Sequence, residues 1–121
     1  MAKILVAEDE RDIRELVEFA LQYYGHDVLT AIDGENAWEL TLAEQPDLVL
    51  LDVRMPRLDG YEVCRRIKGD HNLRHIPVAF LSAKGQEAEV QAGMNAGAEE
   101  YILKPFSMEQ LIQVITRLLN A

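Results

Sequence analysis

Residues 48–62 read LVLLDVRMPRLDGYE, a run of four apolar residues that meets Asp52 and then passes into loop-forming residues. An unbroken apolar run of this length predicts a strand of a parallel sheet that is covered on both faces. Pro56 restricts the following loop, and Gly60 is typical of a turn with unusual backbone dihedral angles after Asp59. Asp52 at the mouth of such a strand has three interpretations: a helix cap, a metal ligand or a covalent nucleophile.

Strand-like and helix-like patterns alternate along the rest of the chain. We expect strands at residues 3–7, 27–31, 47–51, 76–81 and 101–103. The helices that follow them are expected at 13–24, in the segment that Pro46 ends, at about 61–68, at 86–96, and from the cap residue Ser107 to about 118. Five such units predict an α/β fold with a parallel sheet, right-handed crossovers and helices on both faces. Without a linker or internal repeat, residues 1–121 are expected to form one domain.

The composition excludes several classes of protein. Hydrophobic residues make up 49% and charged residues 27% of the 121 residues, an ordinary balance for a globular protein. The net charge of −9 argues against nucleic-acid binding, because a phosphate backbone would be repelled. No apolar run reaches the roughly 20 residues that a membrane-spanning helix needs, and no signal peptide is visible. The single Cys64 excludes a disulfide framework within the chain, so we expect a packed thiol and a cytoplasmic location.

Polar residues stand where the predicted strands end. Glu8 and Asp9 follow the first strand, Asp52 the third, Ser82 the fourth and Lys104 the fifth. Each of them alone has an ordinary explanation as a cap or a surface residue. Together they are expected at one edge of the sheet, because the carboxyl ends of parallel strands form the ligand-binding edge of such folds. Crowded carboxylates would raise one another's pKa, and a divalent cation with oxygen ligands, Mg²⁺ rather than zinc, resolves that conflict.

Four motifs occur in order along the chain: ILVAEDE at 4–10, LVLLDVRMPRLDG at 48–60, IPVAFLSA at 76–83 and GAEEYILKPF at 97–106. On these motifs the chain resembles the receiver domain of two-component response regulators, over its whole length. The resemblance implies a doubly wound, flavodoxin-like (βα)5 domain with strand order 2-1-3-4-5. It also implies a signalling switch rather than an enzyme, one that at most catalyses its own phosphorylation and dephosphorylation.

The resemblance assigns roles to the residues at the sheet edge. Asp52 would take a phosphoryl group from a histidine kinase or a histidine phosphotransfer protein. Asp9 would bind Mg²⁺ directly and Glu8 largely through water, while Asp52 and the backbone carbonyl of Arg54 would complete the protein ligands.

The remaining motif residues would surround the phosphoryl group. Ser82 would donate a hydrogen bond to its oxygens, and Lys104, before a Pro105 that is usually cis in receivers, would form an ion pair with them. Arg54 and Lys84, two residues beyond Asp52 and Ser82, would tune the lifetime of the phosphoryl group.

Signalling would run through Ser82 and Tyr101. If Ser82 moves toward the phosphoryl group, it leaves space that the Tyr101 ring can enter, and this two-state element would alter the surface of the fourth helix, fifth strand and fifth helix. That surface would contact a downstream protein or an output domain, or form a phosphorylation-dependent homodimer. We expect no direct contact with nucleic acid or membrane.

Two other classes share parts of this pattern. A magnesium-dependent phosphatase of the haloacid-dehalogenase type also uses an Asp nucleophile at a strand end, but it needs a second Asp where this chain has Arg54. A flavodoxin-like FMN carrier would have Ser, Thr and Gly in its first loop, whereas Glu8, Asp9 and Glu10 would repel a phosphate. The kinase, the pathway and the downstream target are not encoded in these motifs. The start at Met1 slightly favours a free-standing regulator over an excised domain.

Overall fold

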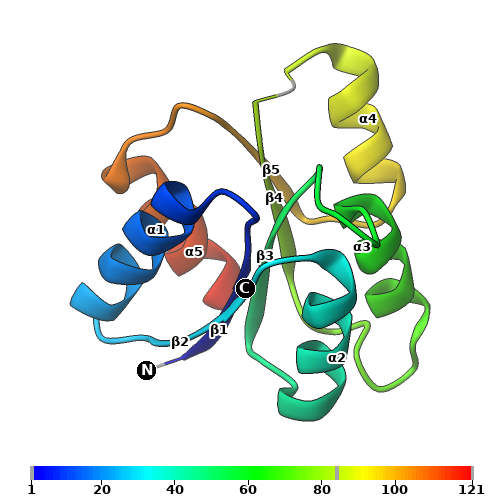
Figure 1. Cartoon of the computed structure of the whole chain (residues 1–121), viewed down its shortest axis with the longest axis horizontal. Helices are drawn as coiled ribbons and strands as arrows, with labels where there is room; N and C mark the ends of the chain where they lie inside the picture. The colour runs from blue at the N-terminus through cyan, green and yellow to red at the C-terminus, as the bar shows by residue number, and fades with distance from the viewer. Residues whose placement is uncertain (1, 84, 121) are drawn as a thin grey trace.

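The computed structural model describes residues 2–83 and 85–120. Five strands and five helices alternate along the chain (Figure 1): β1 Lys3–Ala7, α1 Arg11–Tyr23, β2 Asp27–Ala31, α2 Gly34–Glu44, β3 Leu48–Asp52, α3 Gly60–Gly69, β4 Val78–Ser82, α4 Glu87–Asn95, β5 Glu100–Leu103 and α5 Met108–Leu119. The strands form one sheet in the order β2-β1-β3-β4-β5, and every neighbouring pair is parallel. The predicted fold class and strand order are confirmed.

Helices cover both faces of the sheet. Helices α1 and α5 lie on one face, and α2, α3 and α4 lie on the other (Figure 1). Each face has its own apolar cluster: Leu48 and Leu50 of β3 pack toward α1 and α5, whereas Val49 and Leu51 pack toward the other three helices. Because the central strands are covered twice, all five residues of β3 and of β4 are buried.

The third and fourth strands lie one to two residues further along the chain than predicted. Asp47 is exposed, and its carboxylate and backbone N–H bind Lys3 instead of extending the strand. Pro77 has no N–H to donate, so the pairing of β4 with β3 begins at Val78. As a result Asp52 and Ser82 are the last residues of their strands rather than the first residues beyond them.

Polar caps fix the starts of three helices. The Asp33 carboxylate accepts a hydrogen bond from the Asn36 N–H at the start of α2, and Asp59 does the same for Glu62 in α3. Ser107 caps the start of α5 with a reciprocal capping box, which confirms its predicted role as the cap residue. The sheet edge that carries the loops before these helices is thereby held in a defined geometry.

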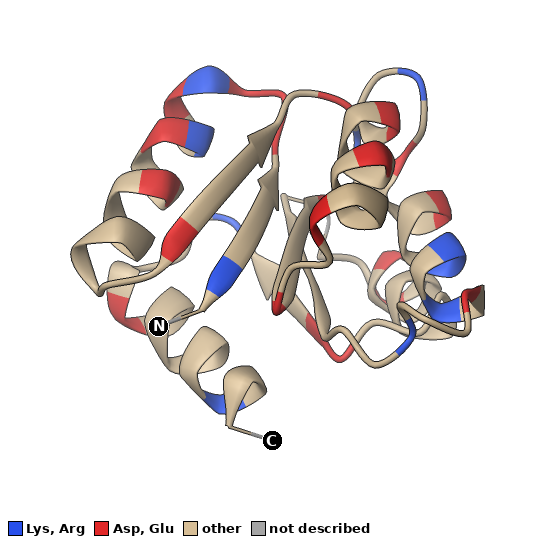
Figure 2. Cartoon of the chain, turned by 90° about the horizontal axis from the view of Figure 1, so that it is seen from below, with Lys and Arg blue, Asp and Glu red and all other residues tan. Residues whose placement is uncertain are grey.

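Acidic residues lie on helices on both sides of the sheet as well as in its loops (Figure 2). Much of the net charge of −9 is therefore spread over the surface, in agreement with a role in solubility. Within the described residues, no helix has the length and apolar character that crossing a membrane requires.

Candidate functional site at the carboxyl edge of the sheet

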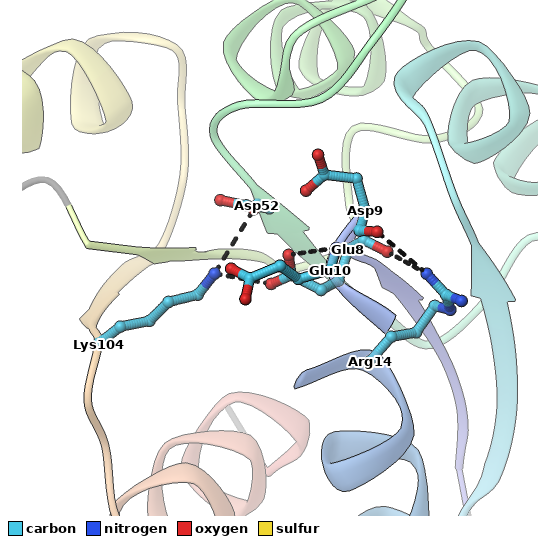
Figure 3. A network of polar contacts seen from close by, with 6 residues as sticks. All are labelled: Glu8, Asp9, Glu10, Arg14, Asp52 and Lys104. Carbon is cyan, nitrogen blue, oxygen red and sulfur yellow. Dashed lines mark hydrogen bonds and ion pairs between the residues drawn. The ribbon is translucent and has the colours of Figure 1, made fainter. Parts of the chain in front are cut away.

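Strand register places Glu8 beside Asp52. Ala7, the last residue of β1, pairs with Leu51, the residue before Asp52 in β3. On its other side Asp52 pairs with Leu81 of β4. The carboxylates at the ends of the first and third strands therefore meet at the centre of the sheet edge (Figure 3).

The same register continues to the fifth strand. Ser82 of β4 pairs with Leu103 of β5, and the backbone N–H of Lys104 donates to the Ser82 carbonyl at 2.8 Å. The Lys104–Pro105 peptide bond is cis, as the resemblance implied. Ser82 is buried, and Lys104 extends its side chain back over the edge of the sheet toward the carboxylates (Figure 3).

Three carboxylates gather at this edge. Glu8, Asp9 and Asp52 each offer an oxygen, and these oxygens lie within 4.8 Å of one another. Glu8 is fully buried and Asp52 is 8% exposed, whereas Asp9 is open to solvent. Such a group concentrates negative charge in a place where water can screen only part of it.

Among the described residues, Lys104 is the cation that forms ion pairs with this group. Its ammonium Nζ lies 2.8 Å from Glu8 Oε1 and 3.5 Å from Asp52 Oδ2. Both partners are nearly inaccessible to solvent, so these ion pairs are stronger than pairs on the surface. One positive charge still does not balance three carboxylates.

The pKa values of the two partners reflect this arrangement. Burial raises the pKa of Glu8 to about 7, helped by a hydrogen bond with Asp52 and moderated by one from Lys104. Burial of Lys104 opposes its charge, but the hydrogen bond to Glu8 and the charge of Asp52 outweigh that effect and raise the pKa of Lys104. Glu8 is therefore the acid at which the excess negative charge is least favourable.

The donor set fits a hard divalent cation. Carboxylate oxygens from Glu8, Asp9 and Asp52 converge, and an exposed Asp9 leaves room for water in the coordination sphere. Mg²⁺ prefers oxygen ligands and retains several waters, whereas zinc sites are built mostly from Cys and His. The uncompensated charge of the cluster is of the sign and size that such a cation would neutralise.

An open hollow of about 260 Å³ lies over this group, lined by Asp9, Glu10, Asp52, Arg54, Ser82, Ala83 and Lys104. The hollow gives a small anionic group a route to Asp52 from solvent. Arg54 is exposed at its rim, two residues beyond Asp52. The predicted partner of Arg54 in controlling access, Lys84, lies outside the described residues.

The expectation for Gly60 was wrong in its reason. Gly60 is the first residue of α3 and needs no unusual dihedral angle; the left-handed conformation in this loop belongs to Arg57, with φ of 71°. A Cβ atom on Gly60 would lie 2.2 Å from the Asp52 carbonyl oxygen. Glycine is required because α3 starts directly against the backbone of the residue that carries the central carboxylate.

Arg14 and Glu10 also belong to the site, although the sequence motifs indicate no role for them there. The Arg14 guanidinium Nη1 donates to the Glu8 carbonyl at 2.9 Å and lies 3.5 Å from the Asp9 carbonyl, so it braces the acidic loop (Figure 3). The Glu10 N–H donates to Glu8 Oε2 at 3.2 Å. The sequence signals this contact only through the position of Arg14, which lies near the start of a helix that follows the acidic loop.

Tyr101 lies on β5, away from the carboxylates. Its half-buried ring packs against Phe80, with ring centroids 5.9 Å apart, and joins the apolar cluster under α2, α3 and α4. The predicted site residues thus fall into a polar group around Asp52 and an aromatic residue on the edge strand β5.

Comparison with known proteins assigns this arrangement to a family. The model of the response regulator receiver domain matches residues 4–116. The chain is 44% identical over 118 residues to the probable transcriptional regulator ycf27 of Cyanophora paradoxa, covering 98% of this chain and 48% of that protein. It is 38% identical over 120 residues to the DNA-binding dual master transcriptional regulator RpaA of Synechocystis, covering 99% of this chain and 50% of that protein. The chain spans about half the length of these curated relatives.

A solved structure of a receiver domain shows the same fold. The receiver domain of the sensor histidine kinase PA1611 from Pseudomonas aeruginosa PAO1, described with a magnesium ion coordinated in its active-site cleft, superposes with a TM-score of 0.93 at 29% identity. The match covers 99% of this chain and 98% of that one. The alternative of a magnesium-dependent phosphatase gains no support from these comparisons.

Proposed function

This chain belongs to the response regulator receiver domain family of two-component signalling proteins, and from that premise we propose that Asp52 is its phosphoacceptor. The donor would be a histidine kinase or a histidine phosphotransfer protein. The observation that carries the proposal is the convergence of Glu8, Asp9 and Asp52 with Lys104 at the mouth of the hollow. No other cluster of three or more acidic, His or Cys ligand atoms occurs among the described residues.

The proposed reaction needs little beyond positioning and charge neutralisation. A carboxylate oxygen of Asp52 attacks the phosphorus, the phosphorus–nitrogen bond of the donor phosphohistidine breaks, and the donor imidazole regains a proton from solvent. Lys104 pairs with the phosphoryl oxygens and the Ser82 hydroxyl donates to them. Glu8, Asp9, Asp52 and the Arg54 carbonyl would hold Mg²⁺, which supplies charge neutralisation on the phosphoryl oxygens.

Water reverses the modification by attacking the acyl phosphate, which releases inorganic phosphate and restores the Asp52 carboxylate. Arg54 at the rim of the hollow, together with Lys84, would limit the approach of that water. The chain in this proposal acts on itself, as a timed switch, and not on an external substrate.

The output would use the surface of α4, β5 and α5. Movement of Ser82 toward the phosphoryl group would leave space that the Tyr101 ring enters, and this would change the surface. A partner protein, an output domain or a second copy of the chain would bind there. Residues 1–121 would serve as one receiver domain in the cytoplasm, without binding nucleic acid or membrane themselves. The net charge of −9 disfavours contact with a phosphate backbone.

The experiment is incubation with acetyl phosphate and Mg²⁺, followed by intact mass and by mapping of the modified residue. One phosphoryl group on Asp52 is expected, with none in Asp52→Asn. Asp47→Asn is the matched control, since Asp47 precedes the same strand at the opposite edge of the sheet and should leave the mass gain unchanged. No gain in the parent, or an equal gain in Asp52→Asn, would overturn the assignment.

The same incubation tests the signalling step. Tyr101→Ala is expected to accept the phosphoryl group nearly as the parent does, because Tyr101 lies away from the carboxylates. Its binding to an output partner, or its change of oligomeric state on size exclusion, should be weakened. Equal partner binding by the phosphorylated parent and Tyr101→Ala would remove Tyr101 from the output path.

A further inference from the structure

Tyr61 of α3 forms a bridge to α4. Its hydroxyl group donates to the Glu89 carbonyl oxygen at 3.0 Å and lies 3.1 Å from the Glu89 carboxylate Oε2. Tyr61 and Glu89 are 28 residues apart in the chain and both are partly buried. The contact therefore ties the first turn of α3, which begins next to Asp52, to the first turn of α4.

The Tyr61 ring starts a row of three aromatic side chains. It meets Phe80 edge-on, with centroids 5.3 Å apart and an interplanar angle of 69°. Phe80 is fully buried on β4 and in turn packs against Tyr101, with centroids 5.9 Å apart and an angle of 50°. Contacts of this geometry are favourable beyond the apolar area that they bury. The row links α3 to β5 through the strand that ends in Ser82.

The far end of the row is closed by α4. Gly93 of α4 faces the Tyr101 ring so closely that a Cβ atom would lie 2.8 Å from a ring carbon. The Tyr101 side chain also lies near enough to the Tyr61 hydroxyl to contribute to the raised pKa of Tyr61. The Tyr101 ring thus packs against the same apolar cluster as Tyr61 and lies against Gly93 of α4.

Burial, together with the neighbouring Tyr101 and Glu89 side chains, raises the pKa of Tyr61 far above its usual range. Tyr61 therefore remains a neutral hydroxyl group, able to donate one hydrogen bond and accept another, throughout the physiological range of pH.

We propose that Tyr61 is a positioning residue of the signalling element, which holds Tyr101 and α4 in the inward arrangement through its hydroxyl group and its ring. The inference rests on the proposed function, in which Tyr101 moves into space that Ser82 vacates. In that scheme Tyr61 limits how far the Tyr101 ring can move inward. The contact between Tyr61 and Glu89 makes α4 move together with that ring.

The consequence is a thermodynamic coupling between Tyr61 and the phosphorylation site. A bond that favours the inward Tyr101 also favours any ligand that binds best to that arrangement, and the coupling acts equally in both directions. The loss of one buried neutral hydrogen bond corresponds to a change of roughly two- to tenfold in an equilibrium constant.

Incorporation of 3-fluorotyrosine gives a direct readout, because the chain contains 4 tyrosines. In Tyr61→Phe, which keeps the ring but removes the hydroxyl, the fluorine resonance of Tyr101 should shift and broaden. Tyr23→Phe is the matched control, since Tyr23 is 78% exposed on α1, and it should leave the Tyr101 resonance in place. Glu89→Gln, which keeps an acceptor for the Tyr61 hydroxyl, should resemble the parent. An unchanged Tyr101 resonance in Tyr61→Phe would overturn the proposal.

Beryllofluoride with Mg²⁺, a mimic of the phosphoryl group, tests the coupling. Tyr61→Phe should bind it about two- to tenfold more weakly than the parent or Tyr23→Phe, with Mg²⁺ affinity and the circular dichroism spectrum unchanged. Equal affinity would reduce Tyr61 to a packing residue and overturn the coupling. If the parent itself bound no beryllofluoride, the proposed function would fail, and the fluorine spectra would still decide whether Tyr61 positions Tyr101.

Discussion

The Lys104 ammonium lies closer to Glu8 than to Asp52, at 2.8 Å against 3.5 Å. Lys104 is thus held first by a buried acid that is not the proposed phosphoacceptor. A divalent cation would draw on the same carboxylates, so the lysine and the metal compete for Glu8 and Asp52. Release of Lys104 from Glu8 would free its charge for a phosphoryl group that arrives on Asp52.

Lys104→Gln should therefore bind Mg²⁺ more tightly and accept the phosphoryl group more slowly. The removal of a neighbouring positive charge favours a cation at the site by about tenfold, a fraction of the Coulomb energy at a few ångströms. Titration calorimetry measures the affinity, and intact mass follows the reaction with acetyl phosphate. Lys3→Gln, at the opposite end of the sheet and partly exposed, should change neither quantity. Weaker Mg²⁺ binding in Lys104→Gln would contradict the competition.

The raised pKa of Glu8 predicts a pH dependence of stability without added metal. The unfolded chain releases the Glu8 proton near 4.5, whereas the folded protein retains it to about pH 7. The contribution of Glu8 to stability is therefore fully present below about pH 4.5, is lost as the pH rises through about 7, and stays constant above that. At about 1.4 kcal/mol per pKa unit, the free energy of unfolding falls by about 3 kcal/mol over this window.

Urea unfolding in the presence of a chelator measures this loss. Glu8→Gln should lack the corresponding slope, while Glu44→Gln, whose carboxylate is 42% exposed, should keep it. Addition of Mg²⁺ should flatten the slope of the parent, because a bound cation favours the ionised carboxylate. Identical slopes in the parent and Glu8→Gln would show that Glu8 titrates normally.

Gly60 and Gly69 form a matched pair at the two ends of α3. A Cβ atom at Gly60 would collide with the Asp52 carbonyl oxygen at 2.2 Å, whereas nothing lies within 4 Å of one at Gly69. Gly60→Ala should lower the free energy of unfolding by about 1–3 kcal/mol and slow phosphorylation, because the Asp52 backbone must shift. Gly69→Ala should change stability by less than about 1 kcal/mol. Equal stability of the two variants in urea would remove the steric argument.

Arg54 is expected to lengthen the lifetime of the phosphoryl group on Asp52. Its exposed side chain stands at the rim of the hollow. The double variant Arg54→Ala, Lys84→Ala should lose the phosphoryl group several-fold faster than the parent, since two long cationic side chains no longer obstruct water. Decay of the phosphorylated mass after removal of acetyl phosphate gives the half-life. Arg65→Ala, in an exposed pair on α3, is the control, and an unchanged half-life in the double variant would defeat the prediction.

Cys64 should be chemically inert in the folded protein. Burial raises the pKa of its thiol to about 11, and its Sγ donates to the Ala96 carbonyl at 3.4 Å. At about pH 8 iodoacetamide should therefore react roughly 100-fold or more slowly with the folded than with the unfolded protein. Mass spectrometry follows the alkylation. Reaction at comparable rates in the two states would contradict burial of this thiol.

The pattern of apolar runs was sufficient to predict the sheet, because parallel strands covered on both faces have a distinctive composition. It was also sufficient to place Asp52, Ser82 and Lys104 at one edge, since parallel connections bring every carboxyl end there. The predicted ends of β3 and β4 differ from the observed ends by one or two residues. The contacts of Asp47 with Lys3 and the missing N–H of Pro77 explain the difference, and hydrophobic periodicity encodes neither.

Burial and long-range contacts could not be predicted in the same way. Glu8 alone looked like a surface charge, and only the pairing of Ala7 with Leu51 shows that it is enclosed. The need for Gly60 arises from the Asp52 backbone across the loop, and the partner of Tyr61 lies 28 residues away. Such contacts depend on how helices and strands pack against one another, and the spacing of apolar residues within one helix or strand does not encode that packing.

The strand order divides the molecule by resistance to local opening. Strands β1, β3 and β4 each have a neighbour on both sides, whereas β5 is an edge strand with one. Backbone amides around Asp52 should therefore exchange with solvent last, and those around Tyr101 much earlier. In the proposed function, the acceptor Asp52 would then lie in the most stable part of the sheet, and the surface that contacts a partner would lie in the part that opens first. A partner bound at β5 would reshape that surface while the strand that carries Asp52 stays intact.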